Sequence, residues 1–282
     1  MSARILDGKK MSESLRADIA ERTARLKEQG ITPGLSVILV GNDPASEIYV
    51  RNKGKGCAEV GIYSRTINLP EDTTQEELEE TIRTLNSDPA IHGILVQLPL
   101  PRHLDENAAL AQILPEKDVD GFHLVYAGHM LTGTEGVIAC TPRGALYMIK
   151  STGVDLAGKE AVVIGRSNIV GKPMAKLLLD RHATVTIAHS RTADLGAVCR
   201  SADVLVVAVG KAKLVTGDMV KPGAVVIDVG MNRDENGKLC GDVDFASAEP
   251  VASYITPVPG GVGPMTIAML MSNTIACFKN HF

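Results

Sequence analysis

The chain has little of several features that would define its class. Tryptophan is absent, and aromatic residues make up only 3% of the 282 residues. This composition argues against the aromatic platforms that bind single-stranded nucleic acid. The net charge is −4 and no block of basic residues occurs, so we expect no nucleic-acid partner. An anionic ligand would need a local cluster of Lys and Arg instead.

Disulfide, membrane and metal signals are also missing. The five cysteines are scattered without a C-x-x-C, which is typical of a reducing compartment. No apolar run approaches the roughly 18 residues of a membrane span, and the N-terminal stretch MSARILDGKK lacks the apolar core of a signal peptide. The seven histidines are dispersed and form no H-E-x-x-H. We therefore expect a cytoplasmic protein with no membrane partner and no metal site.

What the chain does contain is an alternation of strand and helix patterns, which predicts an α/β fold. Short apolar runs predict strands at 35–40, 63–69 and 92–98, and then at 160–165, 183–188, 203–210 and 223–230. Helices are expected at 9–29, 44–60, 74–86, 142–151, 170–181, 192–200 and 264–279. The second strand series is Rossmann-like. Residues 231–245 fit either a hairpin or a mobile loop.

Length and the two strand series favour two domains. The first would comprise residues 1–138, and the C-terminal helix, 265–282, would pack back on it. The second, residues 139–264, would be a Rossmann-like nucleotide-binding domain. We expect a ligand cleft between them.

The stretch SEIYVRNKGKG carries the most compact acid–base candidate. Tyr49 and Lys53 are four residues apart, so they lie on one face of the predicted helix. Such a pair either covers the edge of a core or points into a catalytic cleft. Lys55 lies about 200° from Lys53 around the helix.

Polar residues stand at two further places where strands and loops meet. Gln97, in QLPLP, ends a predicted parallel strand, and ligands gather at that edge of α/β sheets. The amide could equally cap a loop. Asp118 and Asp120 lie close together in PEKDVDGFH, but no His or Glu stands at metal-ligand spacing. Asp120 is better suited to accept hydrogen bonds from a ligand.

A nucleotide-binding turn is indicated by VVIGRSNIVGKP. A strand runs into Gly165 and a helix follows Gly171, which is where a dinucleotide pyrophosphate meets a helix N-terminus. Ser167 replaces the second glycine of the usual G-x-G-x-x-G. A plain strand–turn–helix is the alternative.

The end of the next strand bears on the choice of cofactor. NAD sites usually place an Asp or Glu there for the ribose 2′-hydroxyl. This chain has His189, Ser190 and Arg191 instead, with Arg166 in the preceding loop. The set suits a 2′-phosphate and favours NADP, although Arg191 could also be a solvated surface charge.

The stretch TPVPGGVGPMT precedes the last helix. Its glycines allow the backbone to approach a ligand closely, and its prolines stiffen the loop. A rigid linker is the alternative.

Five long stretches together give the chain a family resemblance. It resembles the bifunctional methylenetetrahydrofolate dehydrogenase/methenyltetrahydrofolate cyclohydrolases. The resemblance rests on VGNDPASEIYVRNKGKGCAEVGI (40–62), GILVQLPLP (93–101), PEKDVDGFH (115–123), GRSNIVGKP (165–173) and TPVPGGVGPMT (256–266), which occur in the family's order and span nearly the whole chain.

The resemblance implies roles for the residues of the first domain. Lys53 looks like the catalytic lysine and Tyr49 like the active-site tyrosine. Gln97 resembles the glutamine that hydrogen-bonds the lysine, and Asp120 the aspartate that anchors the pterin. Substrate contacts are further implied for Leu98, Pro259, Gly260 and Gly261.

NADP contacts are implied for Gly165, Arg166, Ser167, Ser190 and Met231, where the family usually has Ile at the last position. The implied reaction is oxidation of 5,10-methylenetetrahydrofolate by NADP, followed by hydrolysis to 10-formyltetrahydrofolate. A homodimer is implied as well. Two other classes share parts of this pattern: a shikimate dehydrogenase type of enzyme, and a noncatalytic NADP-sensing module.

Overall fold

The computed structural model describes residues 2–279, apart from the side chains of Ala45 and Lys279, and divides into two compact units. The six-stranded unit contains residues 2–12 and 141–266, and the three-stranded unit contains residues 13–140 and 267–279. The boundaries fall inside helices α1 (Gly8–Glu28) and α10 (Val262–Lys279) and at the first residue of α6 (Cys140–Ser151). The chain therefore passes between the units three times.

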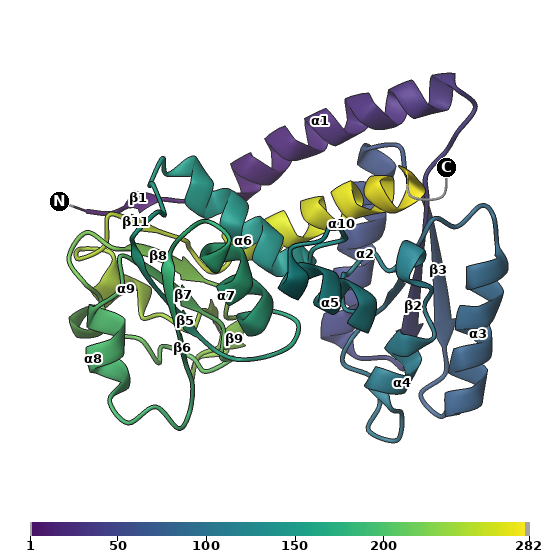
Figure 1. Ribbon diagram of the computed structural model, residues 1–282. Helices are drawn as coiled ribbons and strands as arrows, with labels where there is room; N and C mark the ends of the chain where they lie inside the picture. The colour runs from purple at the N-terminus through teal and green to yellow at the C-terminus, as the bar shows by residue number, and fades with distance from the viewer. Residues whose placement is uncertain (1, 280–282) are drawn as a thin grey trace. The chain divides into compact units, whose positions relative to one another are not determined.

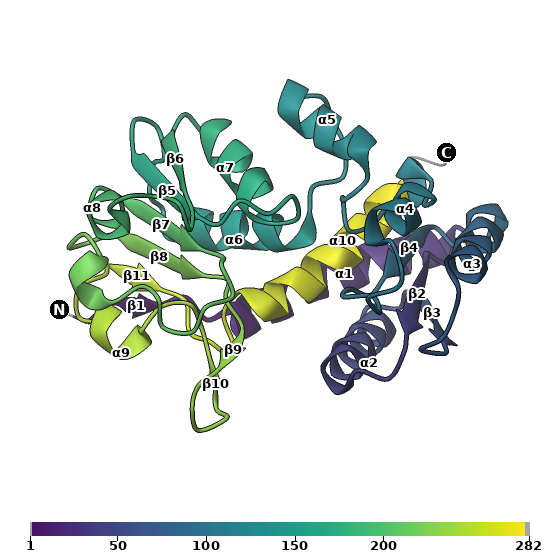
Figure 2. The same cartoon turned by 90° about the horizontal axis from the view of Figure 1, so that it is seen from below.

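The six-stranded unit is a parallel sheet in the order β1-β11-β8-β7-β5-β6. Its strands are β1 (Arg4–Ile5), β5 (Glu160–Ile164), β6 (Thr184–Ala188), β7 (Val204–Val207), β8 (Val225–Asp228) and β11 (Tyr254–Ile255). Its other elements are α7 (Gly171–Leu179), α8 (Leu195–Arg200), η2 (Gly217–Met219), β9 (Asn232–Arg233), β10 (Leu239–Cys240) and α9 (Phe245–Ala248). In Figures 1 and 2, α6 and α7 cover one face of this sheet, and α8 and α9 cover the other.

The three-stranded unit is built on the parallel sheet β3-β2-β4. Its elements are β2 (Gly34–Val40), α2 (Pro44–Glu59), β3 (Tyr63–Leu69), α3 (Gln75–Ser87), β4 (Gly93–Val96), α4 (Glu106–Ala111), η1 (Pro115–Lys117) and α5 (Leu124–Thr132). The apolar side of α3 packs on β2 and β4, where Leu78, Ile82 and Leu85 are buried with Ile38 and Ile94.

The predicted α/β class is confirmed, and most predicted strands lie within one or two residues of the observed ones. The 231–245 segment is a hairpin, because β9 and β10 pair antiparallel around a turn at Gly237. The elements that were not predicted are the short strands β1 and β11, the helices α4, α5 and α9, and the 3-10 turns η1 and η2.

The observed units differ from the expected division at the N-terminus. We expected residues 1–138 to form one domain, but residues 2–12 belong to the six-stranded unit. The reason is that β1 pairs with β11, so Arg4 N donates to Ser253 O (2.8 Å) and Leu6 N donates to Ile255 O (2.8 Å). The last residues of the expected C-terminal helix, 280–282, lie outside the described residues.

Candidate active site

Helix α2 presents the Tyr49 and Lys53 pair. It begins at a standard N-cap, where the carboxylate of Asp43 accepts from Ser46 N at 2.8 Å and Pro44 occupies the first turn. Tyr49 and Lys53 are both half-buried, whereas Lys55 is exposed. Burial raises the pKa of the Tyr49 hydroxyl, so the hydroxyl stays protonated near neutral pH.

Lys53 reaches the end of β4 through Gln97. Its Nζ donates to Gln97 Oε1 at 2.9 Å, and Gln97 Nε2 donates to Leu98 O at 2.6 Å. Because an ammonium group only donates hydrogen bonds, this pair of contacts fixes which way the Gln97 amide points. The lysine is thus held at the carboxyl edge of the three-stranded sheet.

Asp118 and Asp120 play different parts in the following loop. Asp118 is 3% exposed, and its carboxylate accepts from the backbone N–H groups of Asp120 (3.2 Å), Gly121 (3.0 Å) and His123 (2.7 Å). Burial raises the pKa of Asp118, and these backbone hydrogen bonds oppose the shift. Asp118 therefore organises the loop that carries Asp120.

Asp120 is the acid that shares its surroundings with Lys53. Removal from solvent raises the pKa of Asp120 to about 6, while the nearby Lys53 ammonium and a hydrogen bond with Cys140 lower it. A repulsion from Asp118 adds to the rise. The structure thus brings Lys53, Gln97 and Asp120 together and sets Tyr49 one helical turn from the lysine.

The turn after β5 is shaped for close backbone packing. Gly165 has a φ of 121°, and a Cβ there would lie 2.2 Å from Ala208 O. A Cβ on Gly171 would lie 2.2 Å from Gly165 O. The hydroxyl of Ser167 accepts from Val170 N (3.1 Å) and Gly171 N (3.3 Å) at the start of α7. Its own hydrogen remains to donate to a ligand such as a phosphate.

Cationic and neutral donors stand after β5 and after β6. Arg166, Ser190 and Arg191 are exposed. The ring of His189 accepts from Arg191 N through Nδ1 (3.1 Å), so a neutral ring carries its proton on Nε2. Asp194, an acid further along, caps α8 by accepting from Ala197 N (2.8 Å). These donors fit a 2′-phosphate of a dinucleotide.

The Pro/Gly loop is held by the start of α1. A Cβ on Gly8 would lie 1.8 Å from Gly261 O, so α1 begins in direct contact with this loop. Pro259 is exposed and Gly260 half-buried, whereas Gly261 is buried. Met231, 45% exposed, lies near this loop: its Cε would be 3.7 Å from a Cβ on Gly263. Pro259 and Gly260 are the part a ligand can reach.

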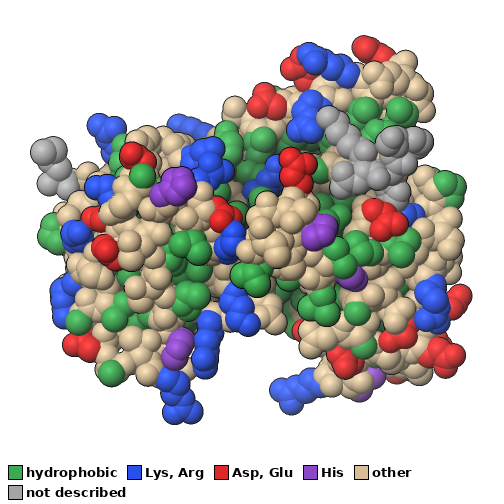
Figure 3. Space-filling view, in the orientation of Figure 1, with side chains coloured by type: hydrophobic (Ala, Val, Ile, Leu, Met, Phe, Trp, Pro, Cys, Tyr) green, Lys and Arg blue, Asp and Glu red, His purple; other side chains and the backbone are tan. Residues whose placement is uncertain are grey.

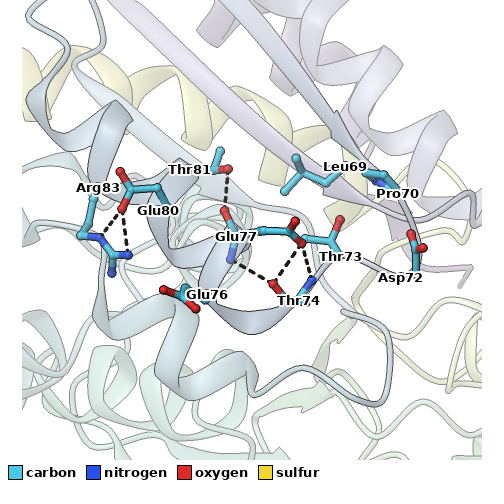
Figure 4. A pocket seen from close by; sticks show the side chains of 10 residues that line it. All are labelled: Leu69, Pro70, Asp72, Thr73, Thr74, Glu76, Glu77, Glu80, Thr81 and Arg83. Carbon is cyan, nitrogen blue, oxygen red and sulfur yellow. Dashed lines mark hydrogen bonds and ion pairs between the residues drawn. The ribbon is translucent and has the colours of Figure 1, made fainter.

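A hollow of about 1040 Å³ lies elsewhere in the three-stranded unit, at the start of α3. Figure 4 shows its polar lining, in which Thr74 and Glu77 form a reciprocal capping box. Helix capping accounts for these contacts. The lining residues are Leu69, Pro70, Asp72, Thr73, Thr74, Glu76, Glu77, Glu80, Thr81 and Arg83, so the predicted site residues are not among them.

Acidic and basic side chains are interspersed over the face in Figure 3. Within residues 2–279, no cluster of three His, Cys, Asp or Glu side chains is placed to hold a metal ion. No helix in the same range is long and apolar enough to cross a bilayer.

Two family models match this chain. The tetrahydrofolate dehydrogenase/cyclohydrolase catalytic domain matches residues 6–120, and the NAD(P)-binding domain of the same family matches residues 139–282. The chain belongs to the tetrahydrofolate dehydrogenase/cyclohydrolase family. It is accordingly an enzyme with a catalytic domain and an NAD(P)-binding domain, as the sequence resemblance implied.

Similar proteins agree with this assignment over the full chain. The bifunctional protein FolD of Acidovorax sp. (strain JS42) is 59% identical over 276 residues, 98% of each chain. The crystal structure of the bifunctional enzyme FolD from Campylobacter jejuni is 50% identical, covers 100% of both chains and has a TM-score of 0.97. The Trypanosoma brucei enzyme, solved with NADP cofactor and inhibitor, is 41% identical, covers 100% of this chain and 99% of its own, and has a TM-score of 0.96.

Several residues that shape the two units were not singled out from the sequence. Asn273 of α10 donates from Nδ2 to Val119 O and Ile138 O, both at 2.9 Å, on either side of the Asp120 loop. Gly8, Asp228 and Asp242 were also missed. Gly8 meets Gly261, and the bonds of the two aspartates join residues up to 33 positions apart, so no local pattern marks them.

Proposed function

We propose that this protein oxidises 5,10-methylenetetrahydrofolate with NADP and hydrolyses the resulting 5,10-methenyltetrahydrofolate to 10-formyltetrahydrofolate. The observation that carries the proposal is the 2.9 Å contact between Lys53 and Gln97, with Asp120 close by, in a chain that matches both domains of the family. The three side chains form a polar site of the kind that the hydrolytic step requires.

The oxidation needs little from the protein beyond placement. NADP⁺, when bound, accepts the hydride that leaves the one-carbon bridge of the folate. The chain's task is to hold the pterin so that this bridge faces the acceptor. Asp120 is suited to that task because an ionised carboxylate accepts two hydrogen bonds from the amino and ring N–H groups of a pterin.

The hydrolysis needs proton handling. Water adds to the cationic methenyl carbon and loses one proton, which leaves a hydroxyl on that carbon. The hydroxyl then gives up its proton and N5 takes one up as the bond from that carbon to N5 breaks, which leaves the 10-formyl group. Lys53, with Tyr49 beside it on α2, is placed to move these protons or to steer the water. Gln97 fixes the lysine at one position through its hydrogen bond. We propose Lys53, Tyr49 and Gln97, together with Asp120, as the catalytic set.

The remaining contacts divide between substrate and cofactor. We propose that Leu98, Pro259, Gly260 and Gly261 line the folate site, the two glycines through their backbone. Gly165, Arg166, Ser167, Ser190 and Met231 would contact NADP. The expected ligand cleft stays a prediction.

The test is a paired assay. Methylenetetrahydrofolate and NADP⁺ should yield NADPH, followed by absorbance, and added methenyltetrahydrofolate should be consumed without any cofactor. Shikimate with NADP⁺ serves as the comparison substrate. Failure to form NADPH from the folate, or activity with shikimate alone, would reject the proposal.

We further propose that the enzyme works in the cytoplasm as a homodimer. The support is the family resemblance together with five cysteines that are all free thiols, four of them buried. Light scattering coupled to size-exclusion chromatography should give twice the 29.9 kDa chain mass. A monomer mass at micromolar concentration would contradict the dimer. Fractionation of cells into cytoplasmic, membrane and exported pools would test the location.

A further inference from the structure

Two carboxylates are buried near the carboxyl edge of the six-stranded sheet. Asp228 is the last residue of β8 and is 3% exposed, and Asp242, just after β10, is fully buried. Within residues 2–279 neither forms an ion pair. Burying such groups is costly unless hydrogen bonds compensate for the lost water, so the contacts they make instead are informative.

The carboxylate of Asp242 accepts four hydrogen bonds. Its Oδ2 accepts from Val209 N (2.6 Å) and Gly210 N (3.0 Å), and its Oδ1 accepts from Lys211 N (2.8 Å) and Asn232 Nδ2 (2.9 Å). Three consecutive backbone amides after β7 are therefore held by one side chain. The fourth donor, Asn232, belongs to the hairpin strand β9, so Asp242 also holds that strand.

The carboxylate of Asp228 holds the backbone at Asp242. Its Oδ1 accepts from Gly230 N (2.9 Å) and from Asp242 N (3.0 Å), and its Oδ2 accepts from Val243 N (2.9 Å). Its own backbone N–H donates to Thr256 Oγ1 at 2.7 Å. The segments after β8 and after β10 are thus joined to each other through Asp228.

The neighbouring glycines leave room for these carboxylates. A Cβ on Gly230 would lie 2.3 Å from Asp242 Oδ1, and a Cβ on Gly241 would lie 1.8 Å from Asp228 Oδ2. Ordinary side chains at either position would displace a carboxylate. The arrangement therefore requires aspartates at 228 and 242 and glycines at 230 and 241.

The segment after β7, which Asp242 holds, lies next to the proposed cofactor-binding turn after β5. A Cβ on Gly165 would meet Ala208 O at 2.2 Å, so the segment after β7 runs against that turn. Val209, whose N–H donates to Asp242, and Met231, which lies between the bonded residues Gly230 and Asn232, are 36% and 45% exposed although apolar. Exposed apolar side chains at this edge suit the flat face of a nicotinamide ring, which would cover them.

We propose that Asp242 is a positioning residue for the nicotinamide half of NADP, acting through the backbone of Val209–Lys211 and through Asn232 beside Met231. The inference rests on the proposed use of NADP. Asp242 does not touch the cofactor; it holds the apolar wall in the shape that the ring requires, so the free protein does not have to order this wall on binding.

The test compares Asp242→Asn with Asp242→Ala. The asparagine keeps an acceptor oxygen but presents N–H groups to at least one backbone donor. We expect the dissociation constant for NADPH to rise about 10–100-fold in the alanine variant, with a smaller rise in the asparagine variant. Amide hydrogen exchange at Val209, Gly210 and Lys211 should accelerate in both. Asp244→Asn is the matched control, because no side-chain capping bond is made by Asp244.

A second ligand separates positioning from general loss of structure. Adenosine 2′,5′-bisphosphate carries the adenosine half of NADP without the nicotinamide, so its affinity should stay within about twofold of wild type. Hydrolysis of methenyltetrahydrofolate, which uses no NADP, should persist. Equal weakening of both ligands, or unchanged NADPH affinity with unchanged exchange at the three amides, would overturn the proposal. These binding readouts stand even if the wild-type protein had no folate activity.

Discussion

At the scale of single residues, α2 separates a functional lysine from an ordinary one. Lys53 is half-buried and donates to Gln97, whereas Lys55, two residues further on, is exposed. The pairing of Tyr49 with Lys53 could be predicted because helical periodicity alone puts residues four apart on one face. The contact with Gln97 could not be predicted from local pattern, since it joins positions 44 residues apart.

We expect Lys53→Met to separate the two activities. Hydride transfer requires alignment of two rings, whereas water addition requires a proton to be moved. Loss of a general acid–base group typically costs about 10²–10⁴-fold. Methenyltetrahydrofolate hydrolysis should therefore fall by that factor, and NADPH formation should fall less. The two rates are measured separately, with methenyltetrahydrofolate supplied directly for the first.

Two variants make that experiment specific. Lys55→Met removes the same charge from the exposed side of α2 and should leave both rates near wild type. Gln97→Ala should slow hydrolysis, because Lys53 loses its fixed partner. Should Lys53→Met hydrolyse the methenyl compound at the wild-type rate, or should Lys55→Met be the inactive variant, the catalytic assignment is wrong.

Folate binding should depend on the ionisation of Asp120. Its pKa is raised from the ordinary value of 3.8 to about 6, so the acceptor carboxylate is present above that pH and is lost as pH falls through it. The dissociation constant of a folate ligand, measured by calorimetry, should rise about tenfold per pH unit below pH 6. Asp120→Asn should bind weakly and without this dependence.

The same folate ligand is titrated against the wild type and Asp120→Asn. Any ionisation of the ligand changes both dissociation constants equally, so the difference between the two pH profiles reports Asp120. NADP binding to Asp120→Ala should remain nearly intact, which shows that the variant is folded. An identical pH profile in the asparagine variant would assign the dependence to another group and leave Asp120 as part of the turn that Asp118 organises.

At the scale of elements, buried strands and capped helices were predictable, and short or atypically capped ones were not. The run LSVILV is fully buried in β2, and Thr74 opens α3 with a capping box. Helix α5 is capped at its N-terminus by His123, whose ring accepts from Val125 N. It exposes Leu124 and Leu131, so it has neither a usual N-cap nor an amphipathic pattern that would reveal it.

The turn between β5 and α7 should set the preference for NADP. Arg166→Ala should weaken NADP binding roughly tenfold to a hundredfold, because a charge-assisted contact with the 2′-phosphate is lost. NAD, which lacks that phosphate, should bind almost as before. Fluorescence titration with NADPH and NADH measures both affinities on the same protein.

Arg181→Ala is the control for a general charge effect. Arg181 is exposed and follows the last turn of α7, at the end of the helix remote from the β5 turn. Removing it should change neither affinity by more than about twofold. Parallel losses for NADPH and NADH in Arg166→Ala would show that Arg166 supports the loop and does not read the 2′-phosphate.

At the scale of the whole molecule, the N-terminus is the feature that sequence patterns misplaced. Residues 4–5 form a two-residue strand whose partner, β11, lies about 250 positions away. A strand so short carries no periodicity of its own, and its pairing is decided by the sheet it joins. The same limit explains why Asp228 and Asp242 escaped notice, because each is defined by partners from other parts of the chain.

The six-stranded unit should depend on that strand for its stability. Leu6 is 3% exposed, and its N–H donates to Ile255 O at the edge of the six-stranded sheet. Leu6→Ala should lower the stability of this unit by about 2–5 kcal/mol through lost burial and a cavity. Ile5→Ala, at a side chain that is 45% exposed, should cost much less.

Hydrogen exchange resolved by unit is the appropriate measurement, because a chain with two compact units need not unfold in one step. In Leu6→Ala, amides of β8 and β11 should exchange faster, while those of β2 and β4 should keep wild-type protection. NADP should restore part of the lost protection if the six-stranded unit binds it, since a ligand stabilises the state that holds it. Faster exchange confined to β2 and β4 would instead place the N-terminal strand's contribution in the three-stranded unit.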